Sequence, residues 1–143
     1  MMVAADANDV TITHPAIAVA GRVMFTLIFF LSGITHFTDL DGYIALMPPQ
    51  IPFRAFWVIT SGVVELIGAT MIALNIYPRL GAWLIVIFLV PVTIAVHGYA
   101  LVNAADEQMK AIQTSFFLKG ITMAGAALLI TQLGVKGERR RAA

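Results

Sequence analysis

The sequence predicts an all-α membrane protein, folded as a bundle of four transmembrane helices with its N and C termini in the cytoplasm. Of the 143 residues, 59% are hydrophobic and only 12% are charged, whereas soluble domains carry about 25% charged residues. The mean hydropathy is +0.88. Most of the apolar sequence falls in four runs of about 20 residues, the length at which a helix crosses a hydrocarbon core of about 30 Å. The chain therefore has room for one membrane domain and for no soluble catalytic domain.

The four apolar runs predict helices over about residues 15–37, 53–74, 79–99 and 114–133. The first run begins at Pro15, because proline is tolerated in the first turn of a helix. Three prolines within Tyr43–Pro52 predict an extended turn that lies against the membrane surface. Pro91 falls inside the third run and predicts a kink. The membrane domain is thus expected over residues 15–133, between an N-terminal segment (1–14) and a basic tail (134–143).

The distribution of basic residues predicts the orientation of the bundle. The side that holds both termini would carry Arg22, Arg79, Lys136, Arg139, Arg140 and Arg141, and the other side would carry Arg54, Lys110 and Lys119. Because cytoplasmic segments are enriched in Lys and Arg, both termini are predicted to be cytoplasmic. The first 14 residues contain no Lys or Arg, unlike the start of a signal peptide, so the first run is expected to stay in the protein as a helix.

Several classes of function are disfavoured by what the sequence lacks. It contains no cysteine, which excludes disulfides, Cys-ligated metals and iron–sulfur clusters. It shows no metal-ligand spacing, no phosphate-binding glycine loop and no nucleophile with a nearby base. We therefore predict no metal site, assign no catalytic residue, and expect a subunit of an oxidoreductase rather than an autonomous enzyme if the protein takes part in catalysis. The basic tail is interpreted as a topology signal and a contact for anionic lipid, and no nucleic-acid partner is expected.

Glu65 places a carboxylate in the middle of the second apolar run. Ionisable residues in a membrane span face the bundle interior and mark functional sites. Gly62, Gly68 and Ala69 share its helix face, so this face is expected to pack against neighbouring helices. Counted from the helix ends, Arg22 lies about 10 Å and Glu65 about 12–15 Å from the same surface, so the two are predicted to pair. Two interpretations stay open: a structural link between helices, or a group that handles protons or binds a ligand.

A second candidate site is predicted at the opposite end of the bundle. The same depth estimate brings His36, His97 and Lys119 to that end, with Asp39 and Asp106 in the loops above them. Histidine can bind metals or exchange protons near neutral pH, so a quinone contact is one interpretation of this outer cluster. In the alternative interpretation the histidines hydrogen-bond to loop backbone, and Lys119 extends its ammonium group to the membrane surface.

Several short motifs occur in a fixed order along the chain. They are Gly21-Arg22, Phe29-Phe30-Leu31-Ser32-Gly33-Ile34, His36-Phe37, Gly62-Val-Val-Glu65-Leu-Ile-Gly68, Tyr77-Pro78-Arg79 and Phe117-Leu-Lys119-Gly-Ile-Thr-Met-Ala-Gly125. With these motifs the chain resembles the DoxX family of small bacterial four-helix membrane proteins. The resemblance implies a multi-pass protein of the bacterial inner membrane. It also implies that Arg22, Glu65, Arg79 and Lys119 are family-typical polar residues.

The same resemblance suggests a redox context. Members of the family have been linked to thiosulfate oxidation with quinone as acceptor, and to membrane oxidoreductase complexes that respond to oxidant and thiol stress. The leading hypothesis is a membrane subunit of a redox-linked system that docks an oxidoreductase partner and binds a quinone or a small apolar ligand. The alternatives are transport of protons or a small solute, for which a homo-oligomer is one form, and a membrane scaffold or assembly protein without catalysis.

Overall fold

The computed structural model of the protein describes residues 14–132. Its helices are α1 (Pro15–Thr38), α2 (Leu40–Leu46), α3 (Arg54–Ala73), α4 (Pro78–Val92), the π-helix η1 (Thr93–Gly98), α5 (Tyr99–Val102) and α6 (Glu107–Gln132). Four stretches are long and apolar enough to cross a membrane: Pro15–Thr38, Arg54–Ala73, Pro78–Val102 and Glu107–Gln132. This confirms the predicted four-helix membrane fold. Residues 1–13 of the predicted N-terminal segment, residue 133 and the basic tail (134–143) fall outside the described residues.

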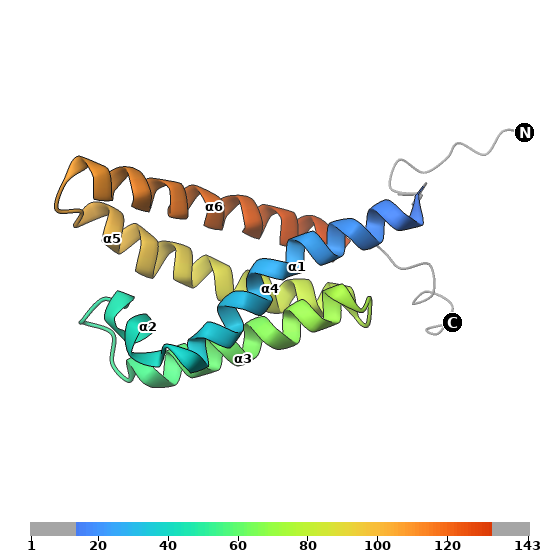
Figure 1. Cartoon of the computed structure of the whole chain (residues 1–143), viewed down its shortest axis with the longest axis horizontal. Coiled ribbons are helices and arrows are strands. Elements are labelled where there is room, and N and C mark those ends of the chain that lie inside the picture. Colours follow the sequence, from blue (N-terminus) through green and yellow to red (C-terminus); the bar gives the residue numbers. More distant parts are fainter. Residues whose placement is uncertain (1–13, 133–143) are drawn as a thin grey trace, which may run out of the picture.

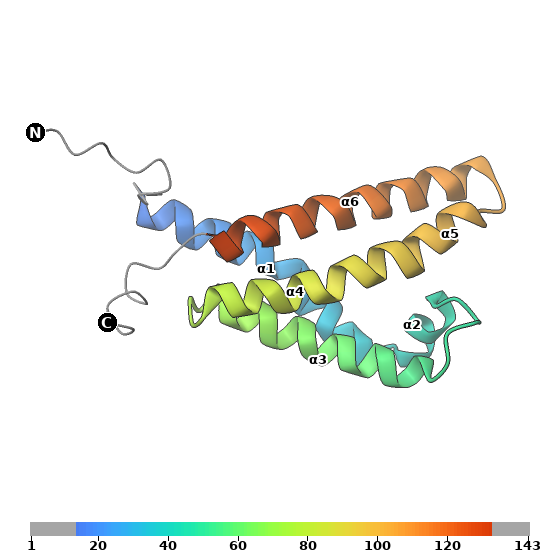
Figure 2. The same cartoon turned by 180° about the vertical axis from the view of Figure 1, so that it is seen from behind.

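The long helices pack in chain order. α1 lies on α3, α3 on α4, and α4 with η1 on α6, so that successive long helices run in opposite directions (Figure 1). The start of α1 and the end of α6 therefore lie at one end of the bundle, and the α2 and α5–α6 connections lie at the other. Seen from behind, α4 lies between α3 and α6 (Figure 2). Its core side chains join one cluster with Phe29 of α1, Ala69 and Ile72 of α3, and Ala124 and Ala127 of α6.

Glycines let the backbones of neighbouring helices approach closely. A Cβ added at Gly68 of α3 would lie 2.9 Å from the carbonyl oxygen of Gly81 in α4, which leaves no room for a side chain. A Cβ added at Gly33 of α1 would lie 2.8 Å from Leu66 and 3.3 Å from the carbonyl oxygen of Gly62 in α3. Small residues at helix contacts are typical of membrane bundles, where van der Waals packing drives helix association. These contacts also set how far each helix is shifted along its neighbour.

Two connections contain more helix than the sequence predicted. The region expected as an extended turn begins with α2, whose first turn is capped when Asp39 Oδ1 accepts a hydrogen bond from the Gly42 amide at 3.3 Å. Helix α6 starts at Glu107, seven residues before the predicted position, because Asp106 Oδ1 accepts from the Met109 amide at 2.7 Å. A prediction based on hydrophobicity detects only the apolar part of a helix, so it missed these polar helical turns.

Pro91 produces a change of helix type inside the third span. The helix continues through Pro91 and becomes π-helical at Thr93–Gly98, after which α5 extends it to Val102. Proline has no amide hydrogen, so the carbonyl four residues earlier loses its helical partner and the local hydrogen-bond register can shift. The local irregularity that Pro91 predicted thus takes the form of a π-helical turn two residues later.

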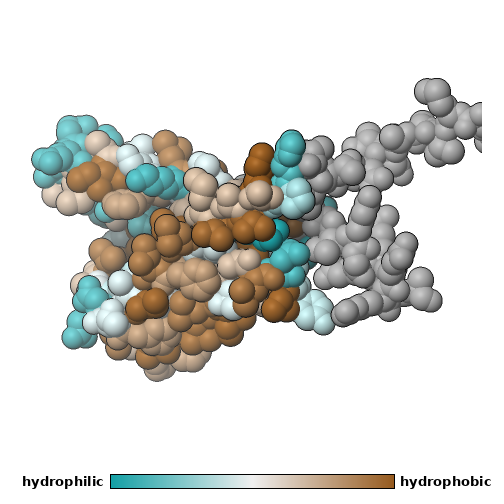
Figure 3. Space-filling view, turned by 45° about the vertical axis from the view of Figure 1, so that its right-hand side comes forward, coloured by the Kyte–Doolittle hydropathy of each residue, from teal (hydrophilic) through white to brown (hydrophobic). Residues whose placement is uncertain are grey.

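The outer surface of the bundle is strongly apolar. Exposed side chains include Met24, Leu31, Ile87 and Leu129, of which Met24 is 76% and Leu129 68% exposed. In the space-filling view a broad hydrophobic surface runs along the helices, while hydrophilic residues gather near the ends (Figure 3). Such an extensive apolar surface would be unfavourable in water but matches the hydrocarbon of a bilayer. The chain is therefore a multi-pass membrane protein in contact with lipid.

Candidate functional site

Glu65 is buried inside the bundle. It lies in α3 on the face that carries Gly62 and Gly68, and its side chain is 1% exposed. Because Gly33 of α1 packs directly against Gly62 and Leu66, the last turns of α1 pass over this part of α3. The carboxyl group consequently meets side chains from α1. Its environment is decided at this helix crossing.

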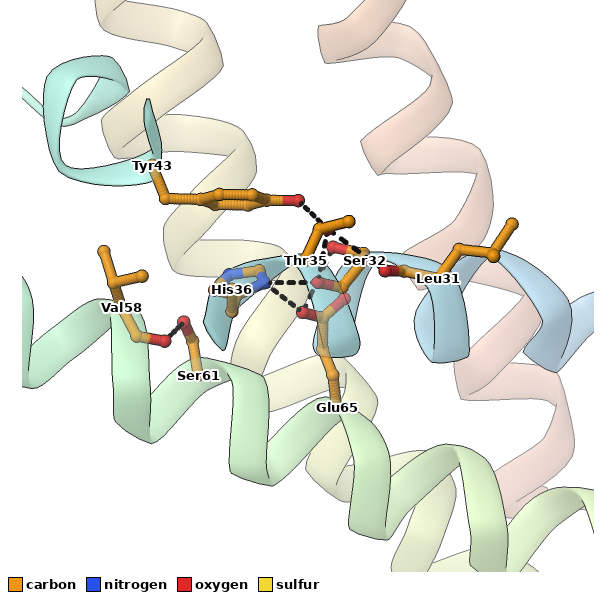
Figure 4. Close-up of polar contacts among 8 residues, drawn as sticks. All are labelled: Leu31, Ser32, Thr35, His36, Tyr43, Val58, Ser61 and Glu65. Carbon is orange, nitrogen blue, oxygen red and sulfur yellow. Dashed lines mark hydrogen bonds and ion pairs between the residues drawn. The ribbon is translucent and has the colours of Figure 1, made fainter. Parts of the chain in front are cut away.

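Two side chains of α1 contact the carboxyl group of Glu65. Ser32 Oγ donates a hydrogen bond to Glu65 Oε2 at 3.2 Å. His36 Nδ1 lies 3.3 Å from the same oxygen, and His36 is itself only 4% exposed (Figure 4). Ser32 and His36 are one helical turn apart, so they present their polar atoms to Glu65 together. We refer to Ser32, His36 and Glu65 as the buried triad.

The hydrogen bonds of His36 define which ring nitrogen carries the proton. Nδ1 lies 2.7 Å from the carbonyl oxygen of Ser32, and a carbonyl oxygen can only accept, so Nδ1 must donate. In a neutral ring Nε2 is then an acceptor. No group in residues 14–132 hydrogen-bonds to Nε2, which leaves this atom available to a ligand or to a second proton. If His36 takes that proton, Glu65 is the carboxylate beside the resulting positive charge.

Aromatic side chains enclose the ring of His36. Tyr43 of α2 stacks over it with ring centroids 4.0 Å apart, and Phe88 of α4 meets it edge-on at 6.2 Å. The Tyr43 hydroxyl lies 2.7 Å from Thr35 Oγ1. The single hydroxyl hydrogen of Thr35 is directed to carbonyl oxygens of its own helix, so Tyr43 is the donor in this bond (Figure 4). Short helix α2 therefore covers the triad at one end of the bundle.

Arg54 holds α2 in this position. Its Nη1 atom donates to the carbonyl oxygen of Ile44 at 3.3 Å, which links the first residue of α3 to α2. The sequence analysis counted Arg54 among the basic residues of one side of the membrane but gave no contact for it. The structure thus gives α2 two polar connections to the bundle, one through Tyr43 and one through Arg54.

The structure does not form the predicted ion pair between Arg22 and Glu65. Within residues 14–132 the ion pairs are His36–Glu65 and the exposed Lys110–Glu107 pair. The depth estimate assumed that α1 and α3 end at the same level, but α1 extends past the α3–α4 turn (Figure 1). Arg22 is ten residues before Ser32, about 15 Å along the helix axis, so it lies far from the carboxylate. The prediction of this pair was wrong because helix ends do not define helix register.

The predicted outer cluster is divided among separate places. His36 belongs to the buried triad, whereas His97 lies in η1, where Nδ1 is 3.4 Å from Gln113 Oε1 and the ring stacks on Phe116 at 5.4 Å. Lys119 is exposed, with its ammonium group 5.4 Å from the centre of the Phe116 ring. Asp39 and Asp106 cap α2 and α6. In the described part of the chain, no three His, Asp or Glu side chains come together as metal ligands.

Sequence reasoning missed that Ser32, Thr35 and Tyr43 surround His36. A usable signal was present for Ser32, because it shares a face of the first helix with His36 at a spacing of four residues. No comparable signal existed for Tyr43, since its position depends on how α2 folds back over α1. The contact of His36 with Glu65 also required the register between two helices.

Comparison with known proteins identifies one similarity. The family model described as DoxX matches residues 17–98, which is more than half of the chain. The matched stretch contains the buried triad, Arg22, Arg79 and His97, while α6 with Lys119 follows it. Searches of curated proteins and of solved structures found no match.

Proposed function

The chain belongs to the DoxX family, and on this premise we propose that it is a membrane subunit of a redox-linked system whose buried triad exchanges a proton with a quinone-type ligand. In this proposal the protein resides in the bacterial inner membrane with both termini in the cytoplasm. A partner oxidoreductase chain supplies the remaining chemistry. This chain acts either as a single copy or as a homo-oligomer. The observation that carries the proposal is the buried contact between His36 and Glu65, with Nε2 of His36 free of partners in residues 14–132.

The chemistry of the triad supports this role. A buried carboxylate is costly in a membrane unless it is paired and hydrogen-bonded. Ser32 donates a hydrogen bond to Glu65 Oε2, the ring of His36 lies beside the same oxygen, and His36 Nε2 offers one position at which a proton can be added or removed. When that proton is present, Glu65 balances the charge on the ring. With Glu65 ionised, the pair carries a net charge of −1 when His36 is neutral and no net charge when His36 is protonated, so Glu65 favours uptake of a proton by the ring.

The surroundings of His36 fit a quinone headgroup. Such a ligand is a flat, apolar ring with carbonyl oxygens, and it supplies coupled electron and proton transfer when bound. Tyr43 and Phe88 provide aromatic rings beside His36, and His36 Nε2 can accept from a hydroxyl group when the ring is neutral or donate to a carbonyl oxygen when it is protonated. The ligand would approach from the apolar surface of the bundle, where quinones dissolve.

The proposal is tested by measuring quinone retained by the purified protein. The wild-type chain and the variants Glu65→Gln and His36→Gln are purified from the native membrane in mild detergent, and bound quinone is extracted and quantified. We expect the wild type to retain at least tenfold more quinone per chain than either variant. Glu107→Gln makes the same change at an exposed carboxylate and should behave as the wild type. Equal quinone content in all four proteins would refute the proposal.

The same preparations test for a partner. Mass spectrometry of co-purifying chains should identify a stoichiometric oxidoreductase subunit with the wild type. Its absence, together with absence of quinone, would favour the second candidate, in which the buried triad conducts protons across the bilayer. That function is measured directly as proton flux into liposomes, and Glu65→Gln should abolish the flux if the triad carries it. Absence of quinone and of flux, combined with loss of a membrane complex on deletion, would favour a scaffold role.

A further inference from the structure

Two arginines at the opposite end of the bundle from α2 carry buried donors that lack acceptors. The Nε atoms of Arg22 and Arg79 are inaccessible to solvent, and no atom of the described chain accepts a hydrogen bond from either. Neither guanidinium group lies within 4.0 Å of a carboxylate in residues 14–132, where the ion pairs involve other residues. Buried polar groups in proteins are nearly always hydrogen-bonded, so we expect the Nε–H group of each arginine to have an acceptor outside the described chain.

The two arginines stand on corresponding helix faces. Helices α1 and α4 run in the same direction, since α3 returns the chain between them (Figure 1). Phe29 of α1 and Val86 of α4 belong to one core cluster. Arg22 and Arg79 each lie seven residues before these two positions, which is almost two full turns, so each continues the same face about 10 Å toward the end that holds Pro15 and Gln132.

The contact between His36 and Phe88 gives an independent estimate of the register. Their rings are 6.2 Å apart, and Arg22 lies 14 residues before His36 whereas Arg79 lies nine residues before Phe88. On this measure Arg22 is about 8 Å farther out along the bundle than Arg79. Both estimates place the two arginines toward the same end of the bundle, at levels that differ by about 8 Å or less.

The positive charge around Arg79 and Arg22 also favours binding of an anion. Arg79 is in the first turn of α4, where the helix dipole is positive and a cation is disfavoured. Tyr77, the residue that precedes this helix, makes no side-chain capping bond. A second cation, Arg22, in the same region adds repulsion that an anion would relieve. An arginine binds phosphate side-on with Nε–H and one terminal N–H, which uses the donor that is unpaired in both residues.

We propose that Arg22 and Arg79 together bind the phosphate group of an anionic phospholipid between α1 and α4 in the leaflet at the end of the bundle that holds Pro15 and Gln132. The apolar surface of these helices, with Met24 and Ile87 exposed, would contact the acyl chains. The phosphate satisfies both Nε donors and neutralises the first turn of α4. This site is distinct from the buried triad and does not depend on the proposed redox function.

The proposal is tested by lipid binding to the purified full-length protein. Native mass spectrometry measures the occupancy of phosphatidylglycerol and of zwitterionic phosphatidylcholine with matched acyl chains, each added at the same concentration. We expect at least tenfold higher occupancy by phosphatidylglycerol. Arg22→Gln and Arg79→Gln should each lower that occupancy at least fivefold, and Arg22→Lys should lower it to a smaller extent because it keeps the charge but loses the side-on fork.

Arg54→Gln is the matched control, because it removes an arginine at the other end of the bundle whose guanidinium group has a backbone acceptor. It should leave phosphatidylglycerol occupancy unchanged. A variant that fails to fold is recognised by the absence of a thermal unfolding transition in detergent. In that case the phosphatidylglycerol occupancy of Arg22→Lys is compared with that of the wild type. Equal binding of the two lipids, or full phosphatidylglycerol binding by the Arg22→Gln/Arg79→Gln double variant, would overturn the proposal. Displacement of phosphatidylglycerol by millimolar inorganic phosphate would assign the site to free phosphate and overturn the lipid assignment.

Discussion

His36 Nδ1 lies 3.3 Å from Glu65 Oε2 and 2.7 Å from the Ser32 carbonyl oxygen. Nδ1 thereby donates to the Ser32 carbonyl oxygen beside the carboxyl group of Glu65, and Nε2 has no hydrogen-bond partner in the described residues. This arrangement joins α1 to α3 and at the same time leaves a single reactive position, Nε2, next to a buried carboxylate. The link between the helices and the proposed proton exchange would therefore depend on the same contact, and variants of Glu65 should affect both.

Glu65→Gln should destabilise the protein by about 1–3 kcal/mol, the range found when a buried hydrogen-bonded group loses its partner or its charge. The amide keeps the shape of the carboxyl group but cannot balance a proton on His36. The measurement is thermal or denaturant unfolding in detergent. Glu107→Gln, an exposed carboxylate on α6, should change stability by less than about 0.5 kcal/mol. An unchanged unfolding midpoint for Glu65→Gln would show that the triad does not stabilise the α1–α3 contact.

Gly81→Val should weaken the packing of α3 on α4. A Cβ at Gly81 would lie 2.8 Å from the carbonyl oxygen of Gly68 and 2.8 Å from Met71, so the helices must separate. We expect a loss of about 1–3 kcal/mol, as for overpacked cores. Gly125→Ala is the control, because a Cβ there meets nothing within 4 Å and alanine favours the helix. An unchanged stability of Gly81→Val would show that the close approach of Gly81 to Gly68 does not limit the packing of α3 on α4.

Tyr43→Phe should increase access to His36. It removes the hydrogen bond from the Tyr43 hydroxyl to Thr35 but keeps an aromatic ring over the imidazole, so the stability loss should be about 0.5–1.5 kcal/mol. The measurement is the rate at which diethyl pyrocarbonate modifies His36, followed by peptide mass spectrometry. We expect the rate to rise severalfold. Tyr77→Phe, at an exposed tyrosine, should leave the rate unchanged, and an equal rise in both variants would argue against a covering role for α2.

Gly120→Ala should disturb the contact between α6 and the π-helix. Its Cβ would overlap the side chain of Thr93, the first residue of η1. The expected cost is about 1–3 kcal/mol. Because Thr93→Ala removes the overlapping atoms, the double variant should recover most of the loss, giving a measurable coupling energy in a double-mutant cycle. Additive effects of the two changes would show that Thr93 and Gly120 do not meet.

The four-helix membrane fold could be predicted from the sequence because hydrophobicity acts locally. Each span can be recognised from the length and apolar composition of its own segment. The start of α1 at Pro15 follows from the geometry of proline, which suits the first turn of a helix. The same local reasoning failed at the start of α6, where an Asp106 cap allows polar turns to join the helix ahead of the apolar run. It also did not show that the irregularity at Pro91 becomes a π-helix.

For the candidate site, the sequence by itself determined that Glu65 needs a partner inside the bundle, since an isolated carboxylate is unfavourable in hydrocarbon. Only the tertiary structure decided that the partners are Ser32 and His36 and that Arg22 stands far away. The physical reason is that helix register is set by close contacts between helices, here Gly33 against Gly62 and Leu66. Those contacts shift α1 along α3 by several turns relative to the alignment of their ends, and no local property of either helix encodes that shift.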